Sequence, residues 1–270
     1  RAITKGEEPG SGDLPPTIET ALSVRLDALS ADAGRLLDIA ATIGTEVPKA
    51  ILTSVAGIAD LSDATIKELI EADILEPVPD RAGVLHFTHS LLQEVAYARL
   101  LRRHAREMHE QIADEVERSY GRGGDAGDLL AHHLYQADLG DRAVIQLLES
   151  AARSEAVFAN DTAMLHLRRA LELGDRHEDA ARHRDDATLR LADLCQHVGA
   201  YEDAEALYRS LLTSPSASRA ACGLAASLRT QGEYNAALDV LNAAVPTTSA
   251  PDDAAMIQLE RGRCLMVTES

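Results

Sequence analysis

Histidines are the first residues in this 270-residue sequence whose type and spacing could bind a metal ion. His132 and His133 are adjacent, so on a helix their side chains would point about 100° apart and would be poorly placed to share one metal. His104 and His109 are five residues apart, whereas two histidine ligands on one helical face need the i, i+4 spacing. We therefore predict no metal site, and expect these histidines to be exposed or hydrogen-bonded.

Motifs for nucleophilic catalysis and nucleotide hydrolysis are also missing from the sequence. No G-x-x-x-x-G-K-[ST] phosphate loop occurs, and the Gly-rich GRGGD at 121–125 lacks the lysine and the preceding strand. No G-x-S-x-G nucleophile elbow is present. Cys195, Cys222 and Cys264 are odd in number and widely spaced, which favours buried thiols over a disulfide framework or a zinc site. We predict that the chain has no catalytic residues and no cofactor of its own.

Positive charge is concentrated in one short stretch, where Arg99, Arg102, Arg103 and Arg106 lie within about two turns of an expected helix. The pairs Arg99 with Arg103 and Arg102 with Arg106 have the i, i+4 spacing that places them on shared faces. Two interpretations remain open. The stretch is either an anion-binding or domain-docking patch, or a solvated helix face offset by carboxylates such as Glu107.

The overall charge argues against partners that are themselves acidic. Lys and Arg total 26 against 44 Asp and Glu, a net charge of −18, which opposes binding to nucleic acid phosphates or anionic membranes. The sequence shows no signal peptide and no run approaching the roughly 18 apolar residues of a membrane span. We expect a cytoplasmic protein with a protein partner. Because the first residue is Arg1 rather than Met, we also expect a piece of a longer protein.

A helical first domain is indicated by composition and by the order of the expected elements. Hydrophobic residues make up 46% of the chain but aromatic residues only 3%, so the core would consist of Leu, Ala, Ile and Val, which favours closely packed helices. Residues 1–13 are polar and Gly-rich and predict a flexible linker. Short helices then precede two extended runs, Leu75–Pro79 and Val84–Phe87, which flank a hairpin turn. Short helices, a two-stranded wing and a following helix predict a winged-helix domain at residues 14–98.

Winged helices often bind DNA, but the expected recognition helix here has the wrong charge. Between Asp60 and Glu76 there are six carboxylates and a single cation, Lys67. A groove lined with phosphates would repel this segment. We therefore expect the domain to pack against protein, and direct DNA binding is the less favoured alternative.

The second half of the sequence repeats itself. The segment GAYEDAEALY from Gly199 recurs as GEYNAALDVL from Gly232, which is 33 residues later. These segments resemble tetratricopeptide repeats, which have a period of about 34, small residues where two helices cross and a Tyr near the turn. An earlier copy around Ala163 lies 41 residues before Ala204, so we expect an insertion of about seven residues near 175–184.

Stacked helix pairs of this kind form an α-solenoid with a concave binding surface. The predicted fold is therefore mainly α: the winged-helix domain, connecting helices at 99–140, and tetratricopeptide-like repeats at 141–270 with a truncated last unit. Counting back from Gly199 and Gly232 places ten residues on the inner helix faces. They contact either a partner or the neighbouring helices, and they are Asp186, Leu189, Asp193, Gln196, His197, Arg219, Cys222, Ala226, Arg229 and Thr230.

Six sequence blocks between Leu14 and about Leu173 together resemble one family of regulators. They are PPTIETALSVRLDALS, LLDIAATIG, FTHSLLQEVAYARLL, the following Arg106 and His109, LAHHLYQA, and the pair Ala151-Ala152. In this order they resemble the region that follows the ATPase core in signal-transduction ATPases with numerous domains, the STAND class. The closest resemblance is to bacterial regulators that join such an ATPase to tetratricopeptide repeats.

The resemblance implies a role for His89. In the STAND class the winged helix packs on the nucleotide-binding core, and a His in a Met-His-Asp motif contacts the phosphates of bound ADP. Here the motif reads Thr88-His89-Ser90, so only the His matches. A His beside a β-phosphate is a charge-assisted donor that favours the diphosphate state. His89 either senses nucleotide in this way, or caps its helix or packs under the wing.

The sequence thus predicts a non-catalytic regulatory fragment of a STAND-type signalling or transcription regulator. Its parent would bind ADP or ATP through its own upstream ATPase core. The repeats would bind a protein, a small-molecule inducer or another copy of the chain. One alternative is a DNA-binding winged-helix regulator with a repeat-based dimerisation arm, and another is a scaffold without any link to nucleotide.

Overall fold

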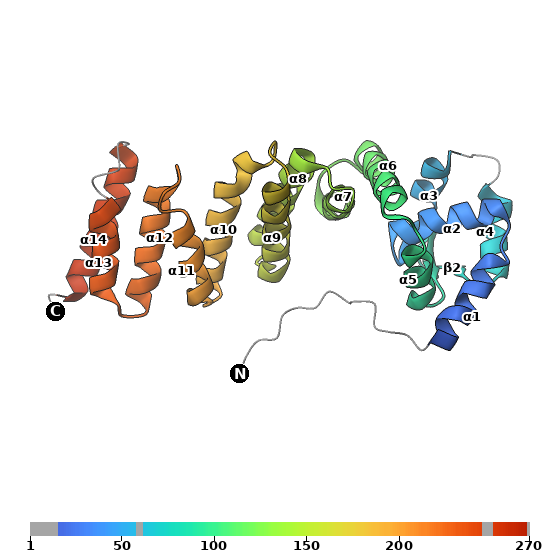
Figure 1. Ribbon diagram of the computed structural model, residues 1–270, viewed down its shortest axis with the longest axis horizontal. Coiled ribbons are helices and arrows are strands. Elements are labelled where there is room, and N and C mark those ends of the chain that lie inside the picture. The colour runs from blue at the N-terminus through green and yellow to red at the C-terminus, as the bar shows by residue number, and fades with distance from the viewer. Residues whose placement is uncertain (1–15, 58–61, 245–250, 269–270) are drawn as a thin grey trace. The chain divides into compact units, whose positions relative to one another are not determined.

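The computed structural model describes residues 16–57, 62–244 and 251–268, and the predicted linker at 1–13 lies outside them (Figure 1). The chain divides into two compact units, residues 1–121 and 122–270. This boundary falls inside the segment 99–140 that the sequence assigned to connecting helices. Among the described residues, no helix has the length and apolar character needed to cross a membrane.

In the first unit, helix α2 occupies the centre of the packing. Its side chain Leu36 is 5% exposed and Leu37 is 3% exposed, and α2 contacts β1 and four other helices of the unit. The hydroxyl of Ser30 caps its first turn by accepting a hydrogen bond from the backbone N–H of Ala33 at 3.2 Å. The helices of this unit are α1 (Pro16–Asp27), α2 (Ala31–Ile43), α3 (Lys49–Ala56), α4 (Ser62–Glu71), α5 (Ser90–Ala98) and α6 (Arg102–Tyr120).

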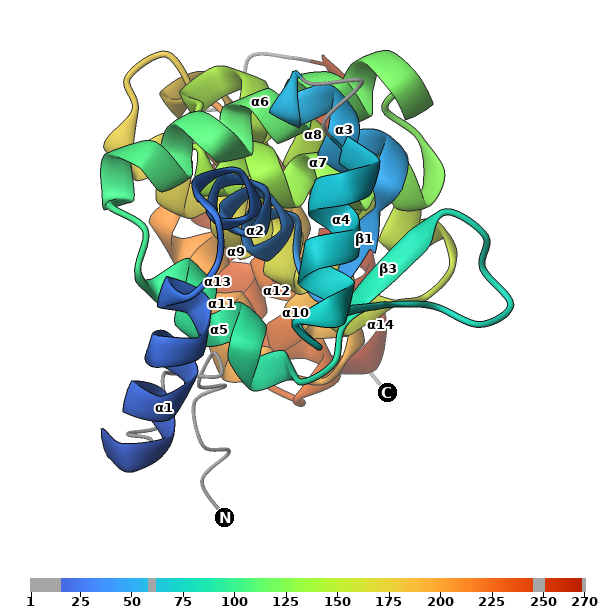
Figure 2. The same ribbon diagram turned by 90° about the vertical axis from the view of Figure 1, so that its right-hand side faces the viewer.

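A three-stranded antiparallel sheet completes the first unit. Strands β2 (Leu75–Pro77) and β3 (Val84–Phe87) form the predicted hairpin, whose turn projects from the unit in Figure 2. A third strand, β1 (Glu46–Pro48), pairs with the other edge of β3 and gives the order β1-β3-β2. The sequence did not predict β1, because three residues ending in Pro are too short to show an alternating pattern. The assignment of this unit as a winged-helix domain stays a prediction.

Helix α6 belongs to the first unit rather than to a separate connector. Its buried side chains Met108, Ile112 and Val116 recur every four residues and pack in a unit where α6 contacts α2 and α3. The carboxylate of Glu115 accepts hydrogen bonds from the hydroxyl of Ser54 on α3 at 2.6 Å and from Ser119. Burial alone would raise the pKa of Glu115, but these bonds and the adjacent Arg118 guanidinium hold it below its ordinary value.

The second unit is a series of helices in which each packs against its neighbours in chain order (Figure 1). This stacking of consecutive helices agrees with the α-solenoid expected from the sequence. The helices are α7 (Gly124–Gln136), α8 (Gly140–Ala156), α9 (Asn160–Arg176), α10 (Arg184–His197), α11 (Tyr201–Ser210), α12 (Ala217–Thr230), α13 (Tyr234–Ala244) and α14 (Pro251–Thr268), with a short 3-10 turn at Ala181–His183.

Small side chains lie where these helices cross, as the repeat predicts. Ala163 on α9, Ala204 on α11 and Ala237 on α13 are all fully buried. The predicted insertion corresponds to the length of α9, which has 17 residues where α11 has 10. The extra turns carry α9 past the point at which α11 ends.

One crossing is too close for any side chain. Tyr208 on α11 is fully buried, and a Cβ added at Gly223 on α12 would lie 2.4 Å from its ring. The Tyr208 hydroxyl donates to the carboxylate of Asp193 at 2.6 Å and to the side-chain oxygen of Gln196 at 3.0 Å. The ring therefore links α10, α11 and α12, and Gly223 provides the space for it.

We predict that Gly223→Ala lowers the free energy of unfolding by about 1–3 kcal/mol, because the methyl group overpacks against the Tyr208 ring. Gly262→Ala is the matched control. Gly262 lies within α14 and a Cβ there meets no atom within 4 Å, so the change should be neutral or stabilising by about 0.5–1 kcal/mol. Urea unfolding of both variants measures the difference, and equal stabilities would contradict the close approach.

Candidate interaction face of the helical repeats

Four turns with one backbone geometry set how consecutive helices of the second unit are placed. Each contains a residue with positive φ: Asp138 (61°), Phe158 (59°), Gly199 (81°) and Gly232 (86°). After each of them, a backbone N–H returns to the carbonyl five residues earlier, as from Ala200 to Cys195 at 2.8 Å. This pairing satisfies the free carbonyls at the end of a helix and reverses the chain into the next one.

Ion pairs join α8 to α10 and α12 to α14. Arg190 on α10 bonds to the carboxylate of Glu155 on α8 at 2.8 Å, and its side chain is only 20% exposed. Arg229 on α12 bonds in the same way to Glu260 on α14 at 2.8 Å. Glu260 also accepts from Arg263 at 2.9 Å and is 5% exposed. These contacts fix the helices that form the predicted inner face.

The predicted contact residues on α10 have different environments. Leu189 is 2% exposed and belongs to the core, so it is not a surface contact. Asp193 and Gln196 are half-buried and accept the hydrogen bonds of the Tyr208 hydroxyl. Burial first, and then the hydrogen bond to Asp193 and the charge of its carboxylate, raise the pKa of that phenol. Asp186 and His197 are exposed. Only these last two present their side chains to solvent.

Helix α12 contributes a similar mixture. Arg219 and Thr230 are exposed, whereas Cys222, Ala226 and Arg229 are half-buried. Burial, followed by the nearby carboxylates Glu260 and Asp253, raises the pKa of Cys222 to about 11, so its thiol is protonated and unreactive at neutral pH. The exposed members of the predicted set are therefore one carboxylate, one imidazole, one guanidinium and one hydroxyl, and they do not form a field of one sign.

The structure adds residues that sequence reasoning missed. Glu155, Arg190 and Glu260 hold the face together, but no local pattern connects residues that pair only across repeats. Phe158 is 86% exposed at a turn position where Gly199 and Gly232 are glycines. The offset of 41 residues between Ala163 and Ala204 could have identified that position, since it also relates Phe158 to Gly199.

In the first unit, His89 is the N-cap residue of α5, and its side chain is exposed and makes no capping hydrogen bond. The His89 side chain therefore neither caps the helix nor packs under the hairpin, and that interpretation is wrong. Its carbonyl alone begins the helix, accepting from the N–H of Leu92 at 3.0 Å.

The four arginines do not form the continuous helix face that was expected. Arg99 ends α5 and Arg102 begins α6, because Leu101 between them is extended (φ −65°, ψ 135°). Arg99 and Arg103 thus share no helix, although Arg102 and Arg106 do. Arg99 pairs with Asp27, and Arg103 pairs with Glu107 at 3.0 Å. This is the arrangement of a solvated surface with internal charge compensation.

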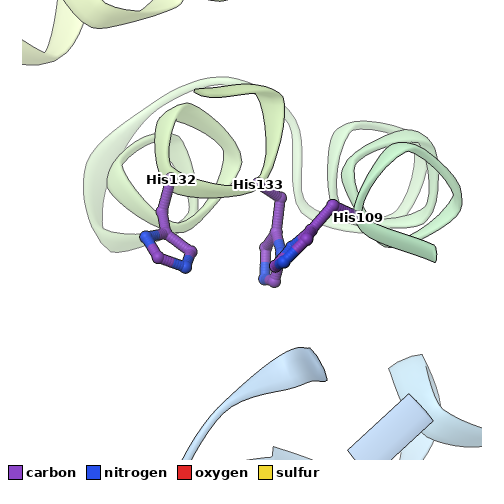
Figure 3. A group of neighbouring side chains, drawn as sticks. All are labelled: His109, His132 and His133. Carbon is purple, nitrogen blue, oxygen red and sulfur yellow. The ribbon is translucent and has the colours of Figure 1, made fainter. Parts of the chain in front are cut away.

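The histidines considered for metal binding are packed in different ways. In the first unit, His104 is exposed, and the Nε2 atom of His109 lies 2.9 Å from the Tyr97 hydroxyl. In the second unit, His132 and His133 project to one side of α7 in the view of Figure 3, with ring centroids 5.2 Å apart. Burial and then the Arg169 guanidinium lower the pKa of His132 to about 4.

Comparison with known families identifies the repeats. The family model described as tetratrico peptide repeat matches residues 143–218 and 212–268. The second unit therefore carries tetratricopeptide-type repeats, as predicted from the recurrence between Gly199 and Gly232. No curated protein matches the chain.

We predict that Arg190→Gln lowers the free energy of unfolding by about 1–2 kcal/mol, because it leaves the half-buried Glu155 carboxylate without its partner. Arg209→Gln is the matched control. Arg209 is 54% exposed and pairs with Glu205 within one helix at 3.3 Å, so its loss should cost at most about 0.5 kcal/mol. Thermal and urea unfolding give both values. A cost for Arg190→Gln no larger than that of the control would show that the cross-helix pair does not hold the face.

Proposed function

We propose that this chain is a non-catalytic regulatory region of a STAND-type ATPase, in which the tetratricopeptide repeats bind a protein or small-molecule inducer and the first unit acts on the nucleotide switch. The observation that carries the proposal is the set of stacked repeats at 143–268, since such repeats generally mediate protein–protein interaction. Their exposed Asp186, His197 and Arg219 offer both signs of charge to a partner.

The topology of the first unit supports its assignment as a winged helix. The order helix, strand, helix, helix, strand, strand runs from α2 to β3, and the sheet order is β1-β3-β2. The projecting hairpin between β2 and β3 would be the wing, and α4 would be the recognition helix.

The surface of α4 favours a protein surface over DNA as its partner. Its exposed side chains include Asp63 and Glu71, while its cation, Lys67, is neutralised by Glu71 at 3.4 Å. Glu68 is held by the backbone N–H and the hydroxyl of Ser30 at 2.8 and 2.7 Å. Asp60, part of the acidic segment noted in the sequence, lies outside the described residues. No cation of α4 remains to contact phosphates.

Fluorescence anisotropy with a labelled DNA duplex at physiological salt distinguishes a STAND-type regulatory region from a DNA-binding winged-helix regulator. We expect no saturable binding with a dissociation constant below about 10⁻⁴ M, because the net charge and the acidic α4 both oppose counterion release from DNA. Submicromolar, salt-dependent affinity would instead support the DNA-binding regulator with a repeat-based dimerisation arm.

The exposure of His89 leaves its imidazole available for a nucleotide phosphate in the intact parent. We predict that His89→Ala in the parent ATPase speeds ADP release about tenfold, through loss of a charge-assisted hydrogen bond of roughly 1.5–3 kcal/mol. Because the side chain makes no capping bond, the melting temperature of the chain itself should not change.

His86→Ala is the control for this experiment. His86 is a partly exposed histidine on the neighbouring strand β3 whose Nε2 atom pairs with Glu76 at 2.8 Å. It should leave ADP release unchanged. If His89→Ala also leaves ADP release and basal activity unchanged, the nucleotide-sensing role is wrong, and the chain is better described as a scaffold.

A further inference from the structure

The end of the long helix α9 forms one wall of a cavity in the second unit. The cavity has a volume of about 460 Å³, within the range of roughly 300–1,000 Å³ typical of ligand sites. Its walls come from the end of α9, the first turns of α10 and the end of α11. Helix α10 packs against both α9 and α11, and Asp175 near the end of α9 pairs with Arg184 at the start of α10 at 2.9 Å.

Three leucines give this cavity part of its surface. Leu171 on α9 and Leu207 on α11 are half-buried, and Leu211 is 4% exposed. Leucine walls of this kind suit a ligand with an aliphatic segment, such as the methylene stem of a long side chain.

The two hydroxyl groups in the lining have already used their protons. The hydroxyl of Thr188 donates its proton to the carbonyl of Arg184 at 2.8 Å, and the hydroxyl of Ser210 donates to the carbonyl of Leu207 at 2.7 Å. A hydroxyl that has donated its one proton still offers lone pairs. Both groups therefore present acceptor capacity and no donor to the cavity.

The charged groups of the lining also favour a ligand that donates hydrogen bonds and carries a positive charge. Arg184 is the one cation in the lining, and it is already paired with Asp175 at 2.9 Å. Asp185 also lines the cavity, and among the residues that the structure describes its carboxylate has no hydrogen-bonding or ion-pair partner. The lining thus has one uncompensated negative charge beside several acceptors.

We propose that this cavity receives the side chain of an arginine from the protein partner of the repeats. The guanidinium group has five N–H donors and no acceptor, which complements a lining of acceptors, and its methylene stem fits the leucine walls. The proposal rests on the proposed function, because it assumes a protein partner, and it names the group by which the partner is held. A lysine offers three donors from a point charge and would use fewer of these acceptors.

Methyl NMR of the 270-residue chain tests the site without the partner. The probe is n-butylguanidinium, and n-butylurea is the neutral control of nearly the same shape. We expect saturable shifts of the Leu171, Leu207 and Leu211 methyl groups with butylguanidinium and an affinity for butylurea about tenfold weaker, since the neutral urea forms no ion pair with the Asp185 carboxylate. Asp185→Asn should lower the affinity for butylguanidinium about tenfold and should change that for butylurea much less.

Asp161→Asn is the matched control variant. Asp161 is also in the first turn of a helix, α9, but does not line the cavity, so the substitution removes the same charge without removing the contact. Equal binding of the two probes, no shift of the three leucines, or an equal effect of both substitutions would each overturn the proposal. None of these outcomes bears on ADP release or DNA binding, so failure here is distinct from failure of the proposed function.

Discussion

The second unit depends on how closely its helices can approach each other. A single helix pair cannot bury its apolar face alone, so each pair in a repeat protein is stabilised by the next one. Here the approach is set by small residues: Ala163, Ala204 and Ala237 at successive crossings, and Gly223 beneath the Tyr208 ring. A larger side chain at any of these positions would separate helices whose burial is shared with both neighbours.

This constraint also decides which polar residues remain for function. Helices held close together bring charged groups into partly desolvated contact, where an unpaired charge is costly. Arg190 and Arg229 are consequently occupied with Glu155 and Glu260, and they align the face rather than recognise a partner. Side chains that lie outside these pairs include His197 and Arg219 on the face and Asp185 at the cavity, and these remain available for recognition.

The sequence predicted what depends on short-range patterns. The hairpin of β2 and β3 and the repeats at Gly199 and Gly232 were found because turn residues and small residues recur at fixed spacing. The turns at Asp138 and Phe158 were missed, because a search for glycine does not find left-handed residues of other types.

For Asp138 the structure gives a reason, since its carboxylate accepts from Arg176 at 2.7 Å and lies 2.8 Å from the His177 Nε2 atom. Phe158 is solvent-exposed and has no such compensation in the contacts of the described residues. Contacts between residues that are distant in the chain were likewise not predictable from the sequence. Strand β1, the partners of Arg190 and the break between α5 and α6 all depend on segments that are distant in the chain or on a single extended residue.

The regulatory interpretation follows from a difference between the two units. In the first, the acidic side chains Asp63 and Glu71 of α4 are exposed, and the imidazole of His89 is exposed and makes no capping hydrogen bond. In the second, α9 is seven residues longer than α11 (17 against 10), and its end lines a cavity together with α10 and α11. A ligand can shift a switch only by the difference in its affinity for the two states. A binding site that depends on the alignment of α9, α10 and α11 has such a difference built in, because any rearrangement of these helices changes the cavity itself.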